Sequence, residues 1–326
     1  MIGRAIAVLL MCVTPGSSEA QVRRVAEMTT TQLLALDRER TVVFMTGGML
    51  EEHGPYLPAF TDGVLSEQLT ADLVKTFVAK KPGWTALLMP PINLGASGYN
   101  EIGGHYVFPG TYAVRPSTLR AMFMDVASDL GEQGFRWIFV VHVHGSPHHI
   151  RALDDAGDFF RDVYGGRMVN LWGLLPVIGG WGRAVYAISD AEKKEEGVSF
   201  HAGMDEHSLM LHLRPQLVDP GYRTAPIVTG ATPKESVDVA RRADWPGYLG
   251  SPRQANAGLG EKIWNSFSAA ASAHMLKILD GADPAQFPRY EHLLRKNPVF
   301  QEWITTGEAR DRERQQRQQE WLAKRR

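Results

Sequence analysis

The chain has 326 residues, of which 44% are hydrophobic and 22% are charged, and its formal net charge at pH 7 is -1. This is an ordinary globular composition, and it gives no reason to expect nucleic acid or an anionic membrane surface as a partner. The chain has one cysteine, Cys12, which excludes a disulfide framework and a site built from several thiolates.

The N-terminal segment has the pattern of a secretory signal. Arg4 precedes an apolar run over residues 5–13, and small residues at positions 18 and 20 lie where a signal peptidase reads the chain. The run is shorter than the roughly 20 apolar residues that span a bilayer, so we expect no membrane span. We expect cleavage after Ala20 and a secreted or periplasmic protein in which residues 21–300 form one domain. The alternative is an N-terminal helix that is retained.

Helical and extended patterns alternate along the chain. The predicted strands are residues 41–45, 84–89, 137–141 and 167–171, and the predicted helices are residues 31–38, 64–80, 117–133 and 148–163. This alternation predicts an α/β layer fold with a mostly parallel sheet, whose sites lie beyond the carboxyl ends of the strands. Residues 178–200, with their Gly-rich and Lys/Glu-rich stretches, are expected to form a long loop that borders such a site.

The first polar cluster, Glu51, Glu52, His53 and Asp62, follows the strand predicted over residues 41–45. In an extended segment Glu51 and His53 share a face, and Asp62 can return to the same point after the intervening loop. Carboxylate and imidazole ligands suit zinc, manganese or iron. Glu52 points the other way and is expected beside the ligands or at the surface. The alternative for these residues taken singly is a capping Asp and a solvated Glu pair.

The second cluster contains four histidines within residues 142–149, directly after the third predicted strand. His142 and His144 alternate at the tip of this strand and therefore share one face. A single strand histidine is more often a core residue, but four in so short a segment favour a metal site. His148 and His149 are alternatively residues of the first turn of the next helix.

The third cluster lies in residues 200–208 and precedes a helix predicted over residues 209–213. Small residues between the polar ones allow two side chains to approach one point. Glu206 is a candidate metal ligand, and His201 is a candidate proton shuttle. Alternatively, Asp205 and Glu206 only interact with the helix N-terminus, which is worth about 0.3–1 kcal/mol.

Residues 301–326 are predicted to form a charged helical tail. From Glu308 onward the chain is rich in Arg, Gln and Glu, and Trp321 and Leu322 are its large apolar side chains. A solvated helix explains this pattern, and a partner-binding helix is the alternative.

The three clusters closely resemble the motifs of the creatininase (creatinine amidohydrolase) family. The similar blocks, in the order of the family, are residues 50–58 with Thr61-Asp62, residues 105–111, His144-Gly145, residues 201–211, and residues 249–252 with Gly260-Glu261. The resemblance covers roughly residues 30 to 285, and the first block is the most specific.

The resemblance implies a three-layer α/β/α fold, a homo-oligomer such as a hexamer, and two divalent metal ions per subunit, Zn²⁺ or Mn²⁺ with Fe²⁺ as a further option. By position, the ligands would be Glu51 and His144 for one metal, His53 for the other, and Asp62 as the bridge. Creatininase has a glutamate ligand where this chain has Ser146, and Glu206 is the natural substitute.

The implied reaction is hydrolysis of a carbon–nitrogen bond in a cyclic or small amide by a hydroxide that bridges the metals. His201 would donate a proton to the departing nitrogen, and Glu206 would be a further catalytic residue. The residues expected to shape the pocket for this small-molecule substrate are His105, Tyr106, Thr111 and His142. Two alternatives stay open. One is a hydrolase or lyase acting on oxidised (3-keto) sugars. The other is an inactive metal-holding binding protein, which is suggested by Ser146 at the position of the creatininase glutamate ligand.

Overall fold

The computed structural model describes residues 20–185 and 187–325. The predicted signal segment therefore lies outside the described residues, apart from Ala20.

A single parallel sheet of five strands lies at the centre of the described residues, as the alternating patterns predicted. In spatial order the strands are β1 (Gln21–Arg24), β3 (Thr85–Leu88), β2 (Thr41–Thr46), β4 (Trp137–Val141) and β5 (Arg167–Asn170). Strand β1 was not predicted, because its residues are exposed and mostly polar, and its extended form depends on pairing with β3. The four remaining strands match their predicted positions within a residue or so at either end.

The helices surround this sheet. They are α1 (Thr30–Leu34), α2 (Thr61–Lys80), α3 (Pro116–Glu132), α4 (Pro147–Tyr164), α5 (Leu175–Val185), α6 (Asp190–Glu196), α7 (Met204–Leu213), α8 (Pro233–Ala240), α9 (Ala257–Leu279), α10 (Tyr290–Lys296) and α11 (Gln301–Ala323). Within residues 20–185 and 187–325, no helix is long and apolar enough to cross a membrane.

The expectation of a long loop over residues 178–200 is wrong, because α5 and α6 occupy most of that segment. Glycines lower the helix propensity of α5, yet Gly180 lets it pack closely on α9: a Cβ added there would lie 2.8 Å from the carbonyl oxygen of Ser266. Helix α6 starts with a capping box between Ser189 and Glu192, a signal that the sequence does carry.

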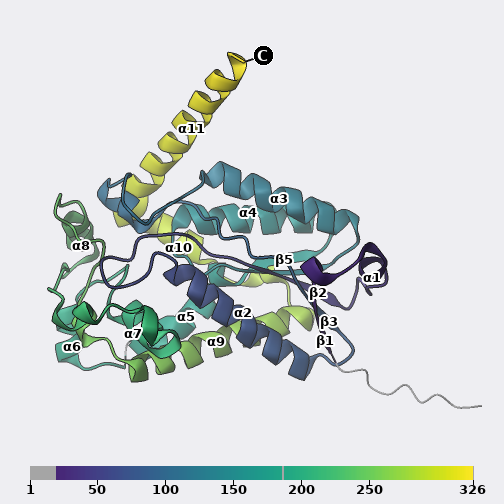
Figure 1. The fold of residues 1–326 in the computed structure, drawn as a ribbon, viewed down its shortest axis with the longest axis horizontal. Coiled ribbons are helices and arrows are strands. Elements are labelled where there is room, and N and C mark those ends of the chain that lie inside the picture. The colour runs from purple at the N-terminus through teal and green to yellow at the C-terminus, as the bar shows by residue number, and fades with distance from the viewer. Residues whose placement is uncertain (1–19, 186, 326) are drawn as a thin grey trace, which may run out of the picture.

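Alternate side chains of the strands build a core on each face of the sheet. Val42 and Phe44 of β2 join the core beneath α2 and α9, whereas Val43 and Met45 join the core beneath α3 and α4. Figure 1 shows these two helical layers on opposite sides of the sheet, which confirms the three-layer α/β/α fold.

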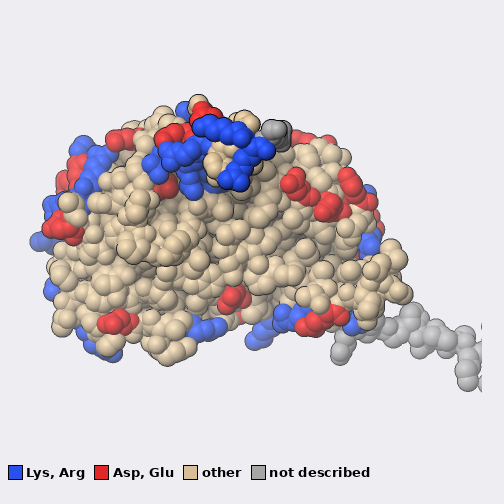
Figure 2. Space-filling view, turned by 45° about the horizontal axis from the view of Figure 1, so that its top comes forward, with Lys and Arg blue, Asp and Glu red and all other residues tan. Residues whose placement is uncertain are grey.

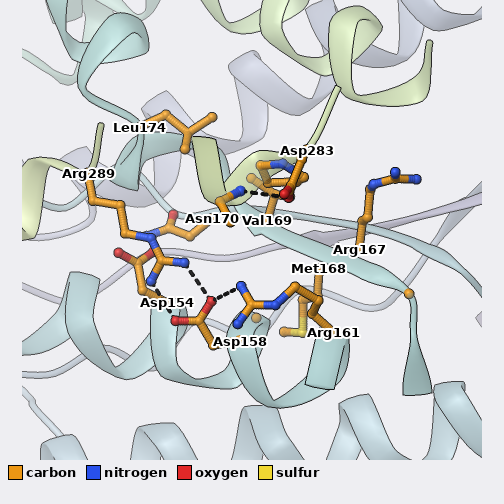
Figure 3. A pocket seen from close by; sticks show the side chains of 14 residues that line it. Asp154, Asp158, Arg161, Arg167, Met168, Val169, Asn170, Leu174, Asp283 and Arg289 are labelled. Carbon is orange, nitrogen blue, oxygen red and sulfur yellow. Dashed lines mark hydrogen bonds and ion pairs between the residues drawn. The ribbon is translucent and has the colours of Figure 1, made fainter. Parts of the chain in front are cut away.

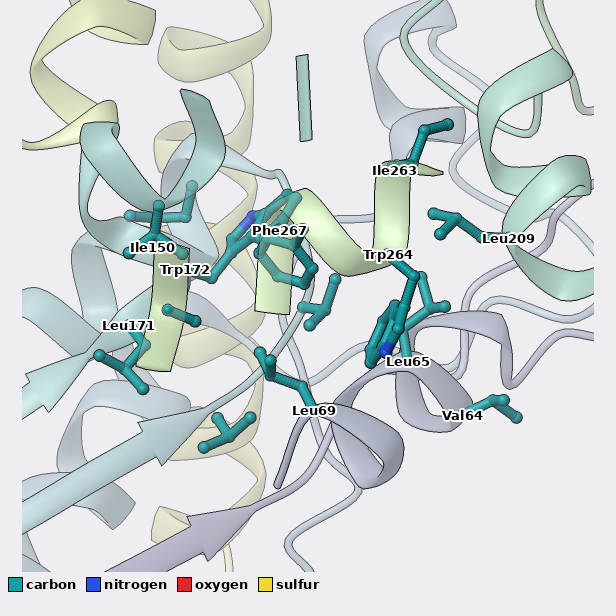
Figure 4. Close-up of a cluster of buried hydrophobic side chains, with 14 of the residues drawn as sticks. Val64, Leu65, Leu69, Ile150, Leu171, Trp172, Leu209, Ile263, Trp264 and Phe267 are labelled. Atoms are coloured by element: carbon teal, nitrogen blue, oxygen red, sulfur yellow. The ribbon is translucent and has the colours of Figure 1, made fainter. Parts of the chain in front are cut away.

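The larger core contains the side chains that hold α9 in place. Trp264 and Phe267 of α9 pack with Leu65 and Leu69 of α2 and with Trp172 (Figure 4). Full burial of each such side chain contributes roughly 1.5–3 kcal/mol to folding. Helix α2, which carries Asp62 of the first polar cluster in its first turn, is thereby fixed against the body of the protein.

The last helix, α11, has a buried start and an exposed end. Trp303 and Ile304 lie in the core, whereas residues 312–325 are all exposed. The helix projects from the body in Figure 1, and Figure 2 shows basic side chains gathered around its far end.

The order of the strands creates a crevice between β2 and β4, which are neighbours in the sheet. The helix after β2, α2, packs on one face of the sheet, whereas the helix after β4, α4, packs on the other. The segments that follow the two strands therefore diverge at their carboxyl ends, where doubly wound sheets hold their ligands.

Candidate metal centre

The structure brings the five predicted ligand residues together in this crevice. Glu51 and His53 follow β2, Asp62 lies in the first turn of α2, His144 follows β4, and Glu206 lies in the first turn of α7. Glu51 Oε2 and Asp62 Oδ2 each lie 2.9 Å from His144 Nδ1. His53 Nε2 lies 3.4 Å from Asp62 Oδ1 and 4.0 Å from Glu206 Oε1.

These side chains form two groups of three that share Asp62. One group is Glu51, Asp62 and His144, and the other is His53, Asp62 and Glu206, with the ligand atoms of each group within 4.8 Å of one another. Each group offers two carboxylates and one imidazole, a donor set that suits a divalent zinc or manganese ion.

A backbone carbonyl oxygen orients the imidazole ring of each histidine in the two ligand groups. His53 Nδ1 lies 2.9 Å from the carbonyl oxygen of Glu51, and His144 Nε2 lies 3.1 Å from that of Ser97. Each carbonyl oxygen accepts a hydrogen bond from the ring N–H, which leaves His53 Nε2 and His144 Nδ1 as the nitrogens that can act as ligands.

Unsatisfied buried atoms indicate that the centre fits a bound cation. Within the described residues, the buried atom His53 Nε2 has no hydrogen-bond partner, and Asp62 Oδ2 forms no hydrogen bond despite its close approach to His144 Nδ1. Buried polar groups are rarely left unsatisfied in this way, and a metal ion would satisfy both atoms.

The charges of the centre stabilise one another strongly. Burial opposes a charge on His53, but the Asp62 carboxylate outweighs it and raises the pKa of His53 to about 10. Burial likewise opposes ionisation of Asp62, yet His144 and His53 lower its pKa well below the ordinary value. The pKa of His144 is also raised, against burial, by Glu51 and Asp62. The centre therefore favours positive charge, whether as protons or as a metal ion.

His201 lies beside the centre and is oriented by Glu52. Its Nε2 lies 2.6 Å from the carbonyl oxygen and 3.2 Å from the carboxylate of Glu52. Its Nδ1 lies 4.0 Å from Glu51 Oε1, and its ring stacks on Tyr99. Glu52 is buried, so the alternative that placed it at the surface is wrong.

His201 can serve in either of two ways. It forms a third candidate ligand group with Glu51 and His53, and it also lines the cavity above the centre. Burial opposes a charge on its ring, but Glu51 and Glu52 raise its pKa to about 9, so it holds a proton that it can donate.

Glu206 lies in the first turn of α7, where a backbone hydrogen bond holds its carboxylate. Its Oε2 accepts a hydrogen bond from the backbone N–H of Ala202, a residue in the left-handed region at φ 48°. Burial raises the pKa of Glu206 to about 7, although His53 opposes this shift. The neighbouring Asp205 turns away and accepts a hydrogen bond from Trp181 Nε1 at 2.8 Å.

The structure does not bring the other predicted pocket residues to the cavity in this chain. His105 Nε2 contacts the carbonyl oxygen of Ala240 at 2.9 Å, and Tyr106 lies under the guanidinium of Arg310. Thr111 Oγ1 accepts a hydrogen bond from the backbone N–H of Glu52.

His142 lies in the buried core and belongs to neither of the two ligand groups. Its ring is fully buried against Phe123 and His149, and burial lowers its pKa to about 3, so it is neutral. His148 and His149 occupy the first turn of α4, as the alternative for these two residues stated. His149 Nδ1 accepts a hydrogen bond from the backbone N–H of Ala96.

A cavity of about 560 Å³ opens above the centre. Its floor includes Glu51, Asp62, His144, His201 and Glu206. Indole and phenyl rings form much of its walls, and its size lies within the range of sites for drug-sized ligands. Sequence reasoning did not find these wall residues, because they come from segments far apart in the chain.

Comparisons with known proteins agree with this geometry. The family model described as creatinine amidohydrolase matches residues 26–275 of the chain. A mycofactocin precursor peptide peptidase from Mycolicibacterium smegmatis is 29% identical over 228 residues, which cover 68% of this chain and 79% of the relative. A creatinine amidohydrolase from Pseudomonas putida is 27% identical over 255 residues, which cover 68% of this chain and 84% of the relative.

A solved structure of creatinine amidohydrolase shares the fold, with a TM-score of 0.58 at 23% identity over 79% of this chain and 98% of the other. Solved creatininase structures include a Zn–Zn form and a Mn form. The family model spans most of the chain, and the ligand residues lie within the match. The chain therefore belongs to the creatininase family of metal-dependent hydrolases.

Proposed function

We propose that this protein is an exported amidohydrolase that uses two divalent metal ions to cleave a carbon–nitrogen bond in a cyclic or small amide. The observation that carries this proposal is the pair of three-residue ligand groups that share Asp62 on the floor of the cavity. Zn²⁺, Mn²⁺ or Fe²⁺ would suit these oxygen and nitrogen donors.

When bound, such ions would supply hydroxide near neutral pH and polarise the carbonyl oxygen of the substrate. The residues of this chain then have separate tasks. Glu51 and His144 would hold one ion and His53 and Glu206 the other, with Asp62 between them. The backbone carbonyls behind His53 and His144 keep both rings in the ligating tautomer.

Departure of the nitrogen requires a proton, and His201 is placed to supply it. Its Nε2 is engaged by Glu52, so its Nδ1 faces the acid side chain of Glu51 and the cavity. Tyr99 stacks on the ring and fixes its plane. A proton on Nδ1 can therefore pass to a leaving amine on the floor of the cavity.

The second candidate is hydrolysis or lysis of an oxidised sugar. The observation that favours it is the combination of Trp172 and Trp181 with the carboxylates of Glu196 and Asp205 around one cavity. Aromatic faces and hydrogen-bond acceptors together suit a sugar ring. The name of the Mycolicibacterium smegmatis relative points in another direction, to a peptide bond, which is also a carbon–nitrogen bond in an amide.

A turnover panel separates these candidates. The protein, loaded with Zn²⁺ or Mn²⁺, is assayed on lactams, formamides, a short peptide and 3-keto-glycosides, with Asp62→Asn as the control. Turnover of an amide by the wild-type protein and its loss in Asp62→Asn would support the proposal. Turnover of the glycosides alone would favour the second candidate, and no turnover at full metal content would favour a metal-holding binding protein.

Export and assembly into a homo-oligomer are further parts of the proposal. Export is supported by the signal pattern that ends at Ala20, and mass spectrometry of the exported protein should find Gln21 at its N-terminus. Assembly, with a hexamer as the first expectation, is checked by light scattering in solution.

A further inference from the structure

Part of the substrate cavity is built from residues beyond the family match. The match ends at residue 275, yet the side chains of Tyr290, Leu294, Phe300 and Trp303 line the cavity. They come from α10, from the short helical turn Pro298–Phe300 and from the start of α11. We call these four cavity-lining side chains the C-terminal wall.

The C-terminal wall presents an apolar, mostly aromatic surface. Phe300 and Trp303 are 5% and 6% exposed and pack edge to face against each other. The ring of Phe300 also packs on Phe200, at 5.4 Å between ring centroids. Trp172 and Trp181 add two indoles to the same cavity. Flat apolar groups gain the most from such a surface, because stacked and edge-to-face ring contacts add to the burial of area.

This surface reaches the metal centre through Tyr99. The ring of Tyr99 lies edge to face with Trp303, at 6.0 Å, and stacks on His201, at 5.2 Å. The backbone N–H of Tyr99 also donates a hydrogen bond to Glu51. A substrate held by the floor of the cavity would therefore place its next substituent against the C-terminal wall.

The C-terminal wall is fixed at its beginning. Arg289 forms two hydrogen bonds to the carboxylate of Asp158 on α4, at 2.6 and 2.7 Å (Figure 3). The carbonyl oxygen of Pro288 accepts a hydrogen bond from the backbone N–H of Leu175 at 2.9 Å. A two-point contact of this kind between a guanidinium and a carboxylate sets the direction in which α10 begins.

The wall is also fixed at its end. Trp303 Nε1 donates a hydrogen bond to Ser97 Oγ at 3.1 Å, and the carbonyl oxygen of Ile304 lies 3.0 Å from His148 Nε2. Because both ends are anchored to the body of the protein, the surface is formed before a ligand binds, and little ordering remains to oppose binding.

We infer that the C-terminal wall selects substrates that carry a flat, apolar group next to the amide that is hydrolysed. This inference rests on the proposed amide hydrolysis and names the substrate class. An aromatic ring fits the chemistry of this surface. A very small cyclic amide would leave most of the cavity of about 560 Å³ unfilled.

Turnover of matched substrates tests the inference. N-benzylformamide and N-methylformamide present the same amide and differ in the apolar group, as do 5-benzylhydantoin and hydantoin. With metal-loaded wild-type protein, we expect kcat/KM to favour the benzyl member of a pair by about tenfold or more. Phe300→Ala should remove most of this preference, and Phe300→Leu, which is less disruptive to folding, should reduce it. Leu293→Ala changes a half-exposed residue of α10 outside the cavity and should leave the preference unchanged.

Binding of two metal-chelating probes separates failure of the inference from failure of the proposed function. Acetohydroxamate and phenylacetohydroxamate have the same chelating group, and calorimetry measures their affinities without turnover. Tighter binding of the phenyl probe, weakened in the Phe300 variants, would support the C-terminal wall even if no amide were hydrolysed. Equal binding of both probes, or a preference that survives in Phe300→Ala and Phe300→Leu at full metal content, would overturn the inference.

Discussion

The carbonyl oxygen of Ser97 lies 3.1 Å from Nε2 of His144, and the hydroxyl of the same serine lies 3.1 Å from Trp303 Nε1. Ser97 thus joins a predicted metal ligand to the last helix of the chain. Its backbone is in the left-handed region, with φ at 63°, a conformation that residues other than glycine seldom adopt. Surrounding contacts must hold it there, and its hydroxyl also donates to Glu101 at 2.7 Å.

Removal of the Ser97 hydroxyl should destabilise the fold. In Ser97→Ala, the buried Trp303 and the half-buried Glu101 each lose a partner, and an unsatisfied buried group costs about 1–3 kcal/mol. Urea denaturation should show this loss in the free energy of unfolding. Ser128→Ala is the control, because Ser128 bonds only the carbonyl of Met124 within its own helix and should change stability little. Equal stability of the two variants would contradict the prediction.

Glu206 should be needed for one of two metal ions. Replacement by Gln keeps the shape but weakens the ligand, so the group of His53, Asp62 and Glu206 would lose its ion, while the group with His144 keeps its own. Elemental analysis after loading and desalting should therefore fall from about two ions per chain to about one. Asp205→Asn is the matched control, since Asp205 bonds Trp181 instead of facing the centre, and its metal content should stay at the wild-type level. A Glu206→Gln protein with unchanged metal content would exclude Glu206 as a ligand.

Metal affinity should rise with pH. The pKa of His53 is raised to about 10 by Asp62 against the effect of burial, and that of His144 is raised by Glu51 and Asp62. Below these pKa values both rings carry a proton that a metal must displace, because only neutral imidazole is a ligand. From pH 6 to pH 8 we expect at least about tenfold tighter Zn²⁺ binding per pH unit, measured by competition with a chelator. Affinity that is flat across this range would contradict the protonated state of the metal-free centre.

Asp154 should make stability depend on pH. Burial raises its pKa to about 7, with Arg289 opposing the shift, and its Oδ2 has no hydrogen-bond partner among the described residues. The folded protein therefore binds a proton more tightly than the unfolded chain, whose carboxyl titrates near 3.8. Stability should fall as pH rises from about 4 to 7, by at most roughly 1.4 kcal/mol per pH unit from this group.

The comparison that checks this is Asp154→Asn against wild type at pH 5 and pH 8. The variant should gain stability relative to wild type at the higher pH, because the amide avoids the buried charge. The same gain at both pH values would show that Asp154 is not the titrating group. Asp125→Asn, at an exposed position of α3, serves as the control.

The sequence predicted a mostly parallel sheet and the convergence of the polar residues that follow its strands, and the structure has both. That these residues bind metal stays a prediction. Apolar runs mark the buried strands, and polar residues directly after β2 and β4 must meet if those strands are parallel neighbours. Alternation along an extended segment places Glu51 and His53 on one side without knowledge of the fold.

What could not be predicted depends on contacts between distant segments. Strand β1 has no apolar pattern and is extended because it pairs with β3. Helix α5 contains several glycines and is helical because it packs on α9. The role of Ser97 depends on Trp303, more than two hundred residues later in the chain, and no local pattern reports such a contact.

The most direct test of the central claim is anomalous X-ray scattering from crystals of the protein soaked in Zn²⁺. We predict two peaks in each subunit that share Asp62: one bound also by Glu51 and His144, the other also by His53 and Glu206. A single peak, or peaks bound by other residues, would contradict a centre of two metals bridged by Asp62.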